Sequence, residues 1–488
     1  MGEDKRVCTG IPGLDEALLG GFLPGRTYLV VGSPGTGKTI LSVQWLRAGA
    51  ARGERSLYIT LAEPISELKR NLAGLGWDLR GIDLVDLSPQ SRPEEAHFQE
   101  YRVFPPSEVE ESAFWQGIWE AVEEHKPERL VLDPVTLLKD LSPDLYQFRR
   151  NLLRLVGFLN GRRITTVLVA EPGDVEEERT LALVGDGVIR LTRTVGPSRL
   201  TELRAVAVEK MRGSGYLPGL HPLRITSEGI VVFPHHVFPP SAQLPSKEGL
   251  GFGIPGLDEL LDGGGGLGTA TVIAGPAGVG KSTLGTRFMA EAARKGLPGV
   301  IYTFEEPPAT VIARGQALGI LDRDLLGSGR LKVMSISPLT LYPDEFLQLV
   351  RHEVEEEGRK AVMIDSLRGY SLAMEEYGSL VTHTHNLAAY LGGRGVTALW
   401  IAETERITGE LSLTELGVSF VFDNALLLRY VEEKGQVIRA IGCLKKRTGK
   451  SSSEIRRLQI TPQGLRVGGE PLHVPGFFTG IAPARETG

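Results

Sequence analysis

An α/β fold, repeated twice along the chain, is the architecture that the sequence of 488 residues predicts. Two observations predict it. Residues 9–38 and 252–281 align without a gap at an offset of 243 (281 − 38). In each half, short β-branched runs alternate with helix-like stretches, which favours a mainly parallel sheet covered by helices on both faces. A repeat of this length indicates duplicated domains rather than the short units of a solenoid.

The two halves are separated by a Pro-rich stretch at 235–248, which has no hydrophobic period and is typical of a linker. We therefore predict an N-terminal domain at 1–234 and a C-terminal domain at 249–488 that includes a short C-terminal tail. The last parts of the two halves, 187–233 and 420–467, consist of alternating β-type segments. They predict an antiparallel extension of each sheet.

Composition and charge exclude several classes of protein. The apolar fraction of 41% is ordinary for a globular protein, and no apolar run is long enough to span a bilayer. A net charge of −6 gives no indication of nucleic-acid binding. The two cysteines, Cys8 and Cys443, supply neither a disulfide framework nor a Cys-based zinc site. We expect a cytoplasmic protein with no membrane contact.

A glycine-rich loop of the pattern G-x-x-x-x-G-K-[ST] occurs once in each half, between a β-branched run and a helix-like stretch. In this context backbone N–H groups and a helix N-terminus point at phosphate oxygens. Lys38 and Lys281 would reach the β- and γ-phosphates of ATP, and Thr39 and Ser282 would hold Mg²⁺. A plain Gly-rich turn is the alternative. The predicted ATP-binding residues are Gly32, Ser33, Pro34, Gly35, Thr36, Gly37, Lys38 and Thr39, and Gly275, Pro276, Ala277, Gly278, Val279, Gly280, Lys281, Ser282 and Thr283.

Two apolar strand-like runs end in an aspartate, at Asp133 and at Asp365. An acidic group at this place would complete the protein's share of a Mg²⁺ shell beside the phosphate-binding loop. An aspartate at a strand end can instead cap the following turn. Because a phosphate-binding loop lies upstream of each, we predict that both are metal-site residues together with Thr39 and Ser282.

Hydrolysis of ATP needs a carboxylate that orients and deprotonates a water in line with the γ-phosphate. Glu305 and Glu306 follow the second strand-like run of the second half, and Glu63 follows that of the first, where Ala62 replaces the leading acid. Adjacent strand residues point to opposite faces, so we expect one glutamate per site to touch the water. Glu63 alone can then suffice. Solvated strand-end acids are the alternative interpretation.

A Lys-x-Arg pair occurs late in each half, as Lys210 and Arg212 and as Lys445 and Arg447. On a strand, residues two apart share a face. Facing the γ-phosphate of a neighbouring subunit, such a pair would neutralise the charge that develops during hydrolysis. From spacing alone, a solvated basic edge that guards against aggregation is the simpler interpretation.

With these residues in view, the chain resembles the KaiC family of tandem RecA-like ATPases over nearly its whole length. The most specific pieces are the paired GIPGLDE segments, TFEEPP, IDSLR, LLLRYVEEKGQVIRAI and the two Lys-x-Arg pairs. The resemblance implies two RecA-type P-loop domains, and a two-tiered homohexameric ring with ATP between subunits. It implies that Arg439 contacts the nucleotide of the neighbouring subunit, and that the single Glu63 supports activity in the first half. It also implies trans action for Lys210, Arg212, Lys445 and Arg447.

The sequence departs from the clock members of this family, which autophosphorylate on an adjacent Ser-Thr pair late in the second domain. The matching positions here are Ser419 and Phe420, and a phenylalanine has no hydroxyl to accept a phosphoryl group. Thr414 keeps a hydroxyl nearby. Ser419 is therefore the candidate phosphosite of a residual Ser/Thr autokinase, although a serine in a β-like run is often merely packed there. Little follows the second domain to receive the activator KaiA, so we expect a KaiC-like ATPase outside a full oscillator.

Three functions compete at this point. The leading hypothesis is an ATP-hydrolysing ring whose nucleotide state sets its affinity for a protein partner that the sequence does not identify. The second is a DNA-dependent RecA- or RadA-like motor. Its DNA-binding loops would correspond to 171–180 and 403–415, but both are net acidic and have no aromatic residue for base stacking. The third is a non-catalytic scaffold, against which the intact Lys, Asp and Glu sets argue.

Overall fold

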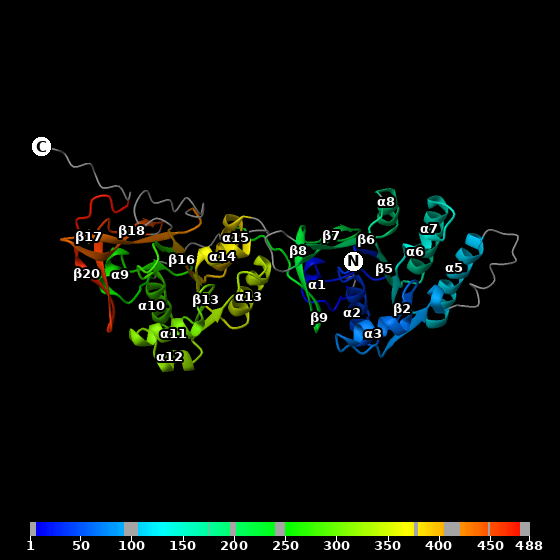
Figure 1. The fold of residues 1–488 in the computed structure, drawn as a ribbon, viewed down its shortest axis with the longest axis horizontal. Helices are drawn as coiled ribbons and strands as arrows, with labels where there is room; N and C mark the ends of the chain where they lie inside the picture. Colours follow the sequence, from blue (N-terminus) through cyan, green and yellow to red (C-terminus); the bar gives the residue numbers. More distant parts are fainter. Residues whose placement is uncertain are drawn as a thin grey trace, which may run out of the picture. The chain divides into compact units, whose positions relative to one another are not determined.

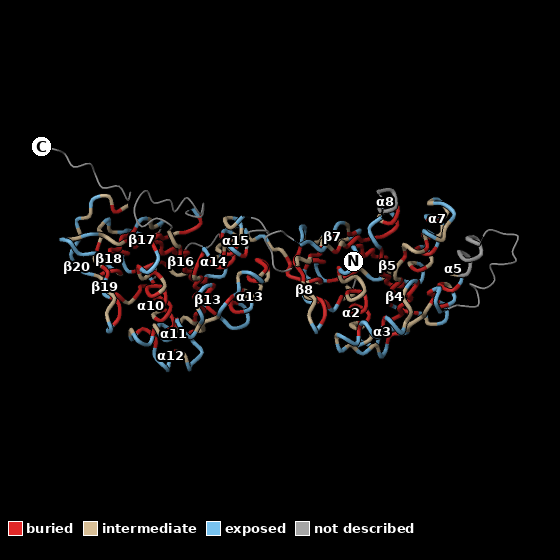
Figure 2. Tube along the Cα trace, viewed as in Figure 1, coloured by how far each residue is buried: buried red, intermediate tan, exposed pale blue. Residues whose placement is uncertain are grey.

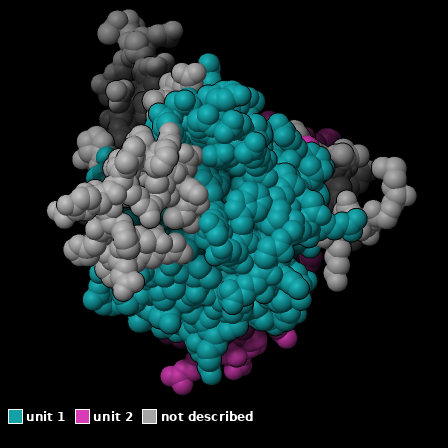
Figure 3. Space-filling model, turned by 90° about the vertical axis from the view of Figure 1, so that its right-hand side faces the viewer, with its two compact units in different colours: residues 1–236 teal, residues 237–488 magenta. Residues whose placement is uncertain are grey.

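The computed structural model divides the chain into two compact units, residues 1–236 and 237–488, shown in teal and magenta in Figure 3. Each unit is described by itself. Among the described residues each contains one nine-stranded sheet, and the predicted fold class is confirmed. The structure describes residues 6–91, 106–173, 175–195, 202–239, 249–374, 379–404, 420–447 and 449–478.

The sheet of the first unit has the strand order β3-β2-β4-β5-β1-β6-β7-β8-β9. Strands β1 to β6 run parallel, and β7 to β9 extend the sheet antiparallel, as the sequence predicted. The strands are β1 (Thr27–Gly32), β2 (Ser56–Thr60), β3 (Ile82–Asp86), β4 (Arg129–Asp133), β5 (Thr165–Ala170), β6 (Gly187–Thr194), β7 (Leu203–Met211), β8 (Leu220–Thr226) and β9 (Gly229–Val232). The helices are α1 (Leu14–Ala17), α2 (Lys38–Ala50), α3 (Ile65–Ala73), α5 (Pro106–His125), α6 (Leu137–Asp140), α7 (Leu145–Gly161) and α8 (Val175–Val184), with a 3₁₀ turn, η1 (Pro89–Ser91).

The second unit repeats this topology in the order β14-β13-β15-β16-β12-β17-β18-β19-β20. Its strands are β12 (Ala270–Gly275), β13 (Gly299–Thr303), β14 (Leu331–Ser335), β15 (Ala361–Asp365), β16 (Thr397–Glu403), β17 (Asn424–Glu433), β18 (Gln436–Lys446), β19 (Ile455–Thr461) and β20 (Gly464–Pro471), with a small ribbon of β10 (Gly249–Leu250) and β11 (Gly265–Gly266). Its helices are α9 (Pro255–Leu260), α10 (Lys281–Arg294), α11 (Pro308–Ala317), α12 (Arg323–Gly327), α13 (Pro343–Glu355), α14 (Leu367–Met374) and α15 (Leu380–Gly393).

Each sheet is buried on both faces, so its central strands lose the apolar-polar alternation of an exposed sheet. In β1 all six residues are buried, with Tyr28 and Val30 in one core cluster and Leu29 and Val31 in the other. Helices α1 to α3 pack on the first face and α5 to α8 on the second. In the second unit α9, α10 and α12 pack opposite α13 to α15 (Figure 1). In Figure 2 the buried segments, in red, gather in the interior of each unit.

The turn from the first strand into the next helix has the same backbone in both units. Gly37 and Gly280, the residues before the loop lysines, have φ of 102° and 111°, in the left-handed region that glycine adopts at low cost. A Cβ on Gly280 would lie 2.7 Å from Ile460, so this position also lacks room for a side chain. The helix N-terminus is thereby held at the carboxyl end of the central strand in each sheet.

The GIPGLDE segments have a structural role. The Asp15 carboxylate accepts a hydrogen bond from the backbone N–H of Thr9 at 2.7 Å, and Asp258 accepts from Phe252 at 2.6 Å and Ile254 at 3.2 Å. Each aspartate ties the approaching chain to the start of a short helix. No described helix is long and apolar enough to cross a membrane.

Candidate nucleotide sites

The loop lysine of each unit lies against its own glycine-rich loop. Lys38 Nζ donates to the carbonyl oxygens of Gly32 at 2.6 Å and Ser33 at 3.2 Å, and Lys281 Nζ donates to Pro276 O at 2.7 Å. Burial lowers the pKa of both ammonium groups, and nearby carboxylates oppose that shift. Each cation is thus held at a loop whose amides can bind phosphate, where a bound polyanion would favour its charged form.

The loop hydroxyl meets the strand-end aspartate in both units. Thr39 Oγ1 donates to Asp133 Oδ2 at 3.0 Å, and the Tyr58 hydroxyl donates to the same oxygen at 2.5 Å. Burial raises the pKa of Asp133, and it raises the pKa of Asp365 to about 6, against the hydrogen bond from Ser282. Two partly buried carboxylates whose charge is disfavoured are groups that a divalent cation would stabilise.

The donor set fits Mg²⁺ bound together with a nucleotide. Each unit offers one hydroxyl and one carboxylate, and Mg²⁺ in nucleotide sites takes its remaining ligands from phosphates and water. Among the described residues, no group of three or more His, Cys, Asp or Glu side chains has the geometry of a self-sufficient metal site. The one hydroxyl and one carboxylate of each unit fit a cation that arrives with its phosphates.

In the first unit Glu63 lies just past the end of β2. Its Oε1 accepts a hydrogen bond from Asn71 Nδ2 at 2.5 Å, and its backbone carbonyl accepts one from Thr60 Oγ1 at 2.6 Å. Burial raises the pKa of Glu63, and the hydrogen bond from Asn71 opposes the shift. A carboxylate with a raised pKa and a neutral partner is a better proton acceptor near neutral pH than an ordinary glutamate.

In the second unit both glutamates line one cavity, which has a volume of about 230 Å³. Glu305 Oε1 accepts a hydrogen bond from Ser366 Oγ at 2.8 Å, whereas Glu306 accepts two from Arg314, both at 2.8 Å. The expectation that the two acids point to opposite faces is wrong, because β13 ends at Thr303 and strand alternation stops there. The other lining residues are Ala277, Gly278, Lys281, Ser282, Thr303, Asp365, Ser366, Ile401 and Glu403.

Glu403 and its counterpart Glu171 lie at the nucleotide sites, although no sequence motif marks them as site residues. Strand β16 lies beside β12, and the register places Glu403 opposite Gly275, the first glycine of the loop. Glu403 therefore lines the cavity with Lys281. In the first unit the charge of Glu171, which follows β5, acts on the pKa of Lys38. Each acid ends an apolar strand in the sequence, but only the strand order reveals that this strand adjoins the phosphate loop.

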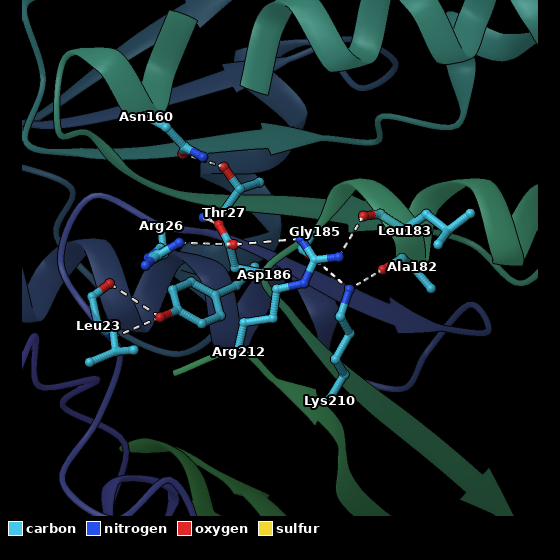
Figure 4. Close-up of polar contacts among 11 residues, drawn as sticks. Leu23, Arg26, Thr27, Asn160, Ala182, Leu183, Gly185, Asp186, Lys210 and Arg212 are labelled. Atoms are coloured by element: carbon cyan, nitrogen blue, oxygen red, sulfur yellow. Dashed lines mark hydrogen bonds and ion pairs between the residues drawn. The ribbon is translucent and has the colours of Figure 1, made fainter. Parts of the chain in front are cut away.

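The first Lys-x-Arg pair is held by backbone carbonyls at the end of α8, as Figure 4 shows. Lys210 Nζ donates to Ala182 O at 2.5 Å and to Gly185 O at 2.7 Å. Arg212 lies 4.0 Å from the Asp186 carboxylate, which is largely buried. The second pair repeats this pattern, because Lys445 Nζ donates to Phe422 O at 2.7 Å and Arg447 lies 3.5 Å from Asp423, with a bond of 2.6 Å to Phe420 O.

Each Lys-x-Arg pair lies at the amino-terminal end of the parallel strands. The phosphate loop of the same unit lies at their carboxyl-terminal end. Arg212 N donates to Asp186 O, and Asp186 Oδ2 accepts from the backbone N–H of Thr27, where β1 begins (Figure 4). The loop starts where β1 ends, at Gly32, roughly 16 Å away along the strand. Neither cation of the pair is placed to reach a phosphate on its own loop.

Arg439 lies apart from Lys445 and Arg447 in the structure. Arg439 lies near the start of β18, eight residues before Arg447 (447 − 439), which is roughly 27 Å on a strand. Its guanidinium stands 5.7 Å from the ring of Tyr430, whose hydroxyl lies beside Gly278 of the phosphate loop. Arg439 therefore lies on the side of the phosphate loop of its own unit, and its contact with the nucleotide of a neighbouring subunit stays a prediction.

Arg204 holds the corresponding place in the first unit, because its Nε donates to Gly35 O at 3.3 Å. Ser419 and Thr414, together with most of 403–415, lie outside the described residues.

Each unit carries a glycine-rich loop, its lysine and hydroxyl, a partly buried strand-end aspartate and a glutamate just past a neighbouring strand, and this set defines a P-loop ATPase domain. Comparison with protein families agrees with the geometry. The family model of the KaiC ATPase matches residues 7–237 and 250–471. The chain belongs to the KaiC family, and it is an ATP-binding ATPase with two RecA-like domains in tandem.

Curated relatives match nearly the whole chain. The circadian clock protein KaiC3 of Synechocystis sp. is 28% identical over 490 residues, which cover 98% of this chain and 94% of the relative. The circadian clock oscillator protein KaiC of Prochlorococcus marinus is 28% identical over 500 residues, which cover 99% and 96%. The resemblance inferred from the sequence motifs is confirmed.

Proposed function

We propose that this ATPase binds and hydrolyses Mg-ATP at two sites per chain, each completed by a neighbouring subunit of a ring, and that nucleotide state switches its affinity for a protein partner. One observation carries the proposal. In each sheet the phosphate loop and its acids lie at the carboxyl-terminal end of the parallel strands, and the Lys-x-Arg pair lies at the opposite end. Each unit then holds parts of two different sites, which a head-to-tail ring would join.

The residues of each unit would share the work of hydrolysis. The loop amides and Lys38 or Lys281 would hold the phosphates, and Arg439 would contact the nucleotide of the neighbouring subunit. Thr39 with Asp133, and Ser282 with Asp365, would hold Mg²⁺, which supplies charge neutralisation at the β- and γ-phosphates. Glu63 in the first site, and one glutamate of the Glu305–Glu306 pair in the second, would orient the attacking water. Lys210, Arg212, Lys445 and Arg447 of the neighbour would stabilise the negative charge of the transition state.

A mixing experiment tests the shared site. In a Lys38→Ala background, which silences the first half, Lys281→Ala and Arg447→Ala should each remove most turnover. Subunits of the two kinds mixed in one ring should regain turnover at up to about one quarter of the interfaces, because half of the loops and half of the cations are intact. A mixture no more active than its parts would contradict trans action.

Autophosphorylation at Ser419 is the second activity that the family resemblance suggests. Incubation with ATP followed by intact-mass analysis should then show a species heavier by about 80 Da, the mass of one phosphoryl group. Its loss in Ser419→Ala would locate the site. The same samples, assayed with and without single-stranded DNA, test the recombinase-like alternative, which requires strong stimulation by DNA.

A further inference from the structure

The two halves differ in the partners of their strand-end acids. Glu63 and Glu306 are aligned at the offset of 243 (306 − 63), and so are their partners Asn71 and Arg314 (314 − 71). The helix after the acid thus supplies a neutral amide in the first half and a guanidinium in the second. Asn71 and Arg314 lie in the helix that follows the acid, α3 in the first unit and α11 in the second.

A second difference lies one residue earlier. Glu305 is aligned with Ala62, and its hydrogen-bond partner Ser366 follows the strand-end aspartate, where the first half has Pro134. Acid and partner are therefore both present in the second half and both missing from the first. Together, these two differences suggest that the two halves use carboxylates at different positions for catalysis.

Arg314 engages Glu306 through a two-point contact. Both guanidinium nitrogens donate at 2.8 Å, one to each carboxylate oxygen. The hydrogen bond to Glu306 raises the pKa of Arg314, so the guanidinium stays charged. The Glu306 side chain is 40% exposed, so the pair contributes little to stability, but bidentate geometry fixes the carboxylate. A water bound to Glu306 would have to compete with a charged donor on each oxygen.

Glu305 is held by a weaker contact. Ser366 donates one neutral hydrogen bond to Oε1, and the carboxylate lines the same cavity as Lys281 and Asp365. A serine hydroxyl orients a carboxylate without neutralising it, so the acid can still accept a proton.

We propose that the two sites use acids at different positions, Glu63 in the first half and Glu305 in the second, and that Arg314 is a positioning residue that withholds Glu306 from the water. This assignment rests on the proposed two-site hydrolysis. In the second half the water oxygen attacks the γ-phosphorus of ATP and its proton passes to Glu305. The bond between that phosphorus and the bridging oxygen breaks with its electron pair on the oxygen, and ADP and inorganic phosphate result.

The test compares variants of the full-length chain in the Lys38→Ala background, with phosphate release and binding of a fluorescent ATP analogue measured on each. Glu305→Gln should lower kcat about 100-fold or more, and Glu306→Gln less than about 5-fold, with analogue binding retained in both. Arg314→Asn added to Glu305→Gln should raise kcat about 10-fold, because Glu306 is released. A gain of turnover cannot come from structural damage. Gln316→Asn, an exposed change on the same helix, is the matched control and should give no gain.

Two results would overturn the assignment while leaving the ATPase function standing: a larger loss in Glu306→Gln than in Glu305→Gln, or equal gains from Arg314→Asn and Gln316→Asn. Absence of turnover in the Lys38→Ala parent would overturn both the assignment and the proposed function of the second half.

Discussion

The two halves of this chain share their strand order and phosphate loops, yet they surround the reacting position with different polar groups. In the first half the strand-end aspartate receives hydrogen bonds from Thr39 and Tyr58, and a single glutamate faces an asparagine. In the second half Ile301 occupies the place of Tyr58, and two glutamates face a serine and an arginine. Duplication preserved the backbone, whereas the side chains that tune proton transfer diverged. The following predictions test that difference.

The largest effect is expected when both acids of the second half are removed. Glu305→Gln with Glu306→Gln, in the Lys38→Ala background, should lower turnover by about 1,000-fold or more because no carboxylate remains to activate water. Binding of ATP should persist, since the loop and Lys281 are intact. Phosphate release and nucleotide binding measure the two effects separately. Undiminished turnover would mean that neither acid takes part.

An arginine at position 71, matching Arg314 of the second half, should lower ATP turnover at the first site. Asn71→Arg, in a Lys281→Ala background that silences the second half, places a guanidinium where Glu63 now has an amide. We expect about a tenfold fall in kcat with little change in KM, because the acid is engaged and the phosphates are not. Asn71→Ala is the control, since it removes the amide without adding charge. Similar losses in both variants would contradict the comparison.

The pH profile of the first site should carry the signature of Glu63. Burial raises its pKa above the ordinary 4.5, so on acidification Glu63 takes up a proton and loses its basicity at a higher pH than an exposed glutamate would. In the Lys281→Ala chain the acid limb of kcat should therefore lie above pH 4.5. Asn71→Asp adds a like charge and should move the limb upward, and Asn71→Arg should move it downward. A limb that neither variant moves would assign the titration to another group.

The smallest effect is expected from Tyr58→Phe. The phenol donates to Asp133 at 2.5 Å, and its loss should lower the free energy of unfolding of the first domain by about 1 kcal/mol. Denaturant unfolding of the full chain, followed by a probe in the first domain, measures it. Ile301→Val in the second half is the matched control, because no hydroxyl is lost there. A larger change in the control would show that packing and not the hydrogen bond matters at this position.

Local sequence was sufficient wherever a function depends on a few consecutive residues. The phosphate loops, their lysines and hydroxyls, and the two strand-end aspartates could be identified without a structure because a strand, a glycine turn and a helix N-terminus are encoded within about ten residues. The doubly covered parallel sheet followed for a similar reason, since buried strands and amphipathic helices leave distinct periods.

Tertiary structure decided which of these groups meet. Arg314 reaches Glu306 from α11, the helix that follows the end of β13, and Glu403 enters the cavity because β16 pairs with β12. Arg439 lies near the start of β18 and Arg447 directly follows the end of that strand, so the length of the strand separates them. Spacing in a sequence reports neither strand order nor the reach of a long side chain across a helix-strand boundary. The sequence alone therefore determined which kinds of residue are present at each site. Packing determined which of them contact one another and so which role each can take.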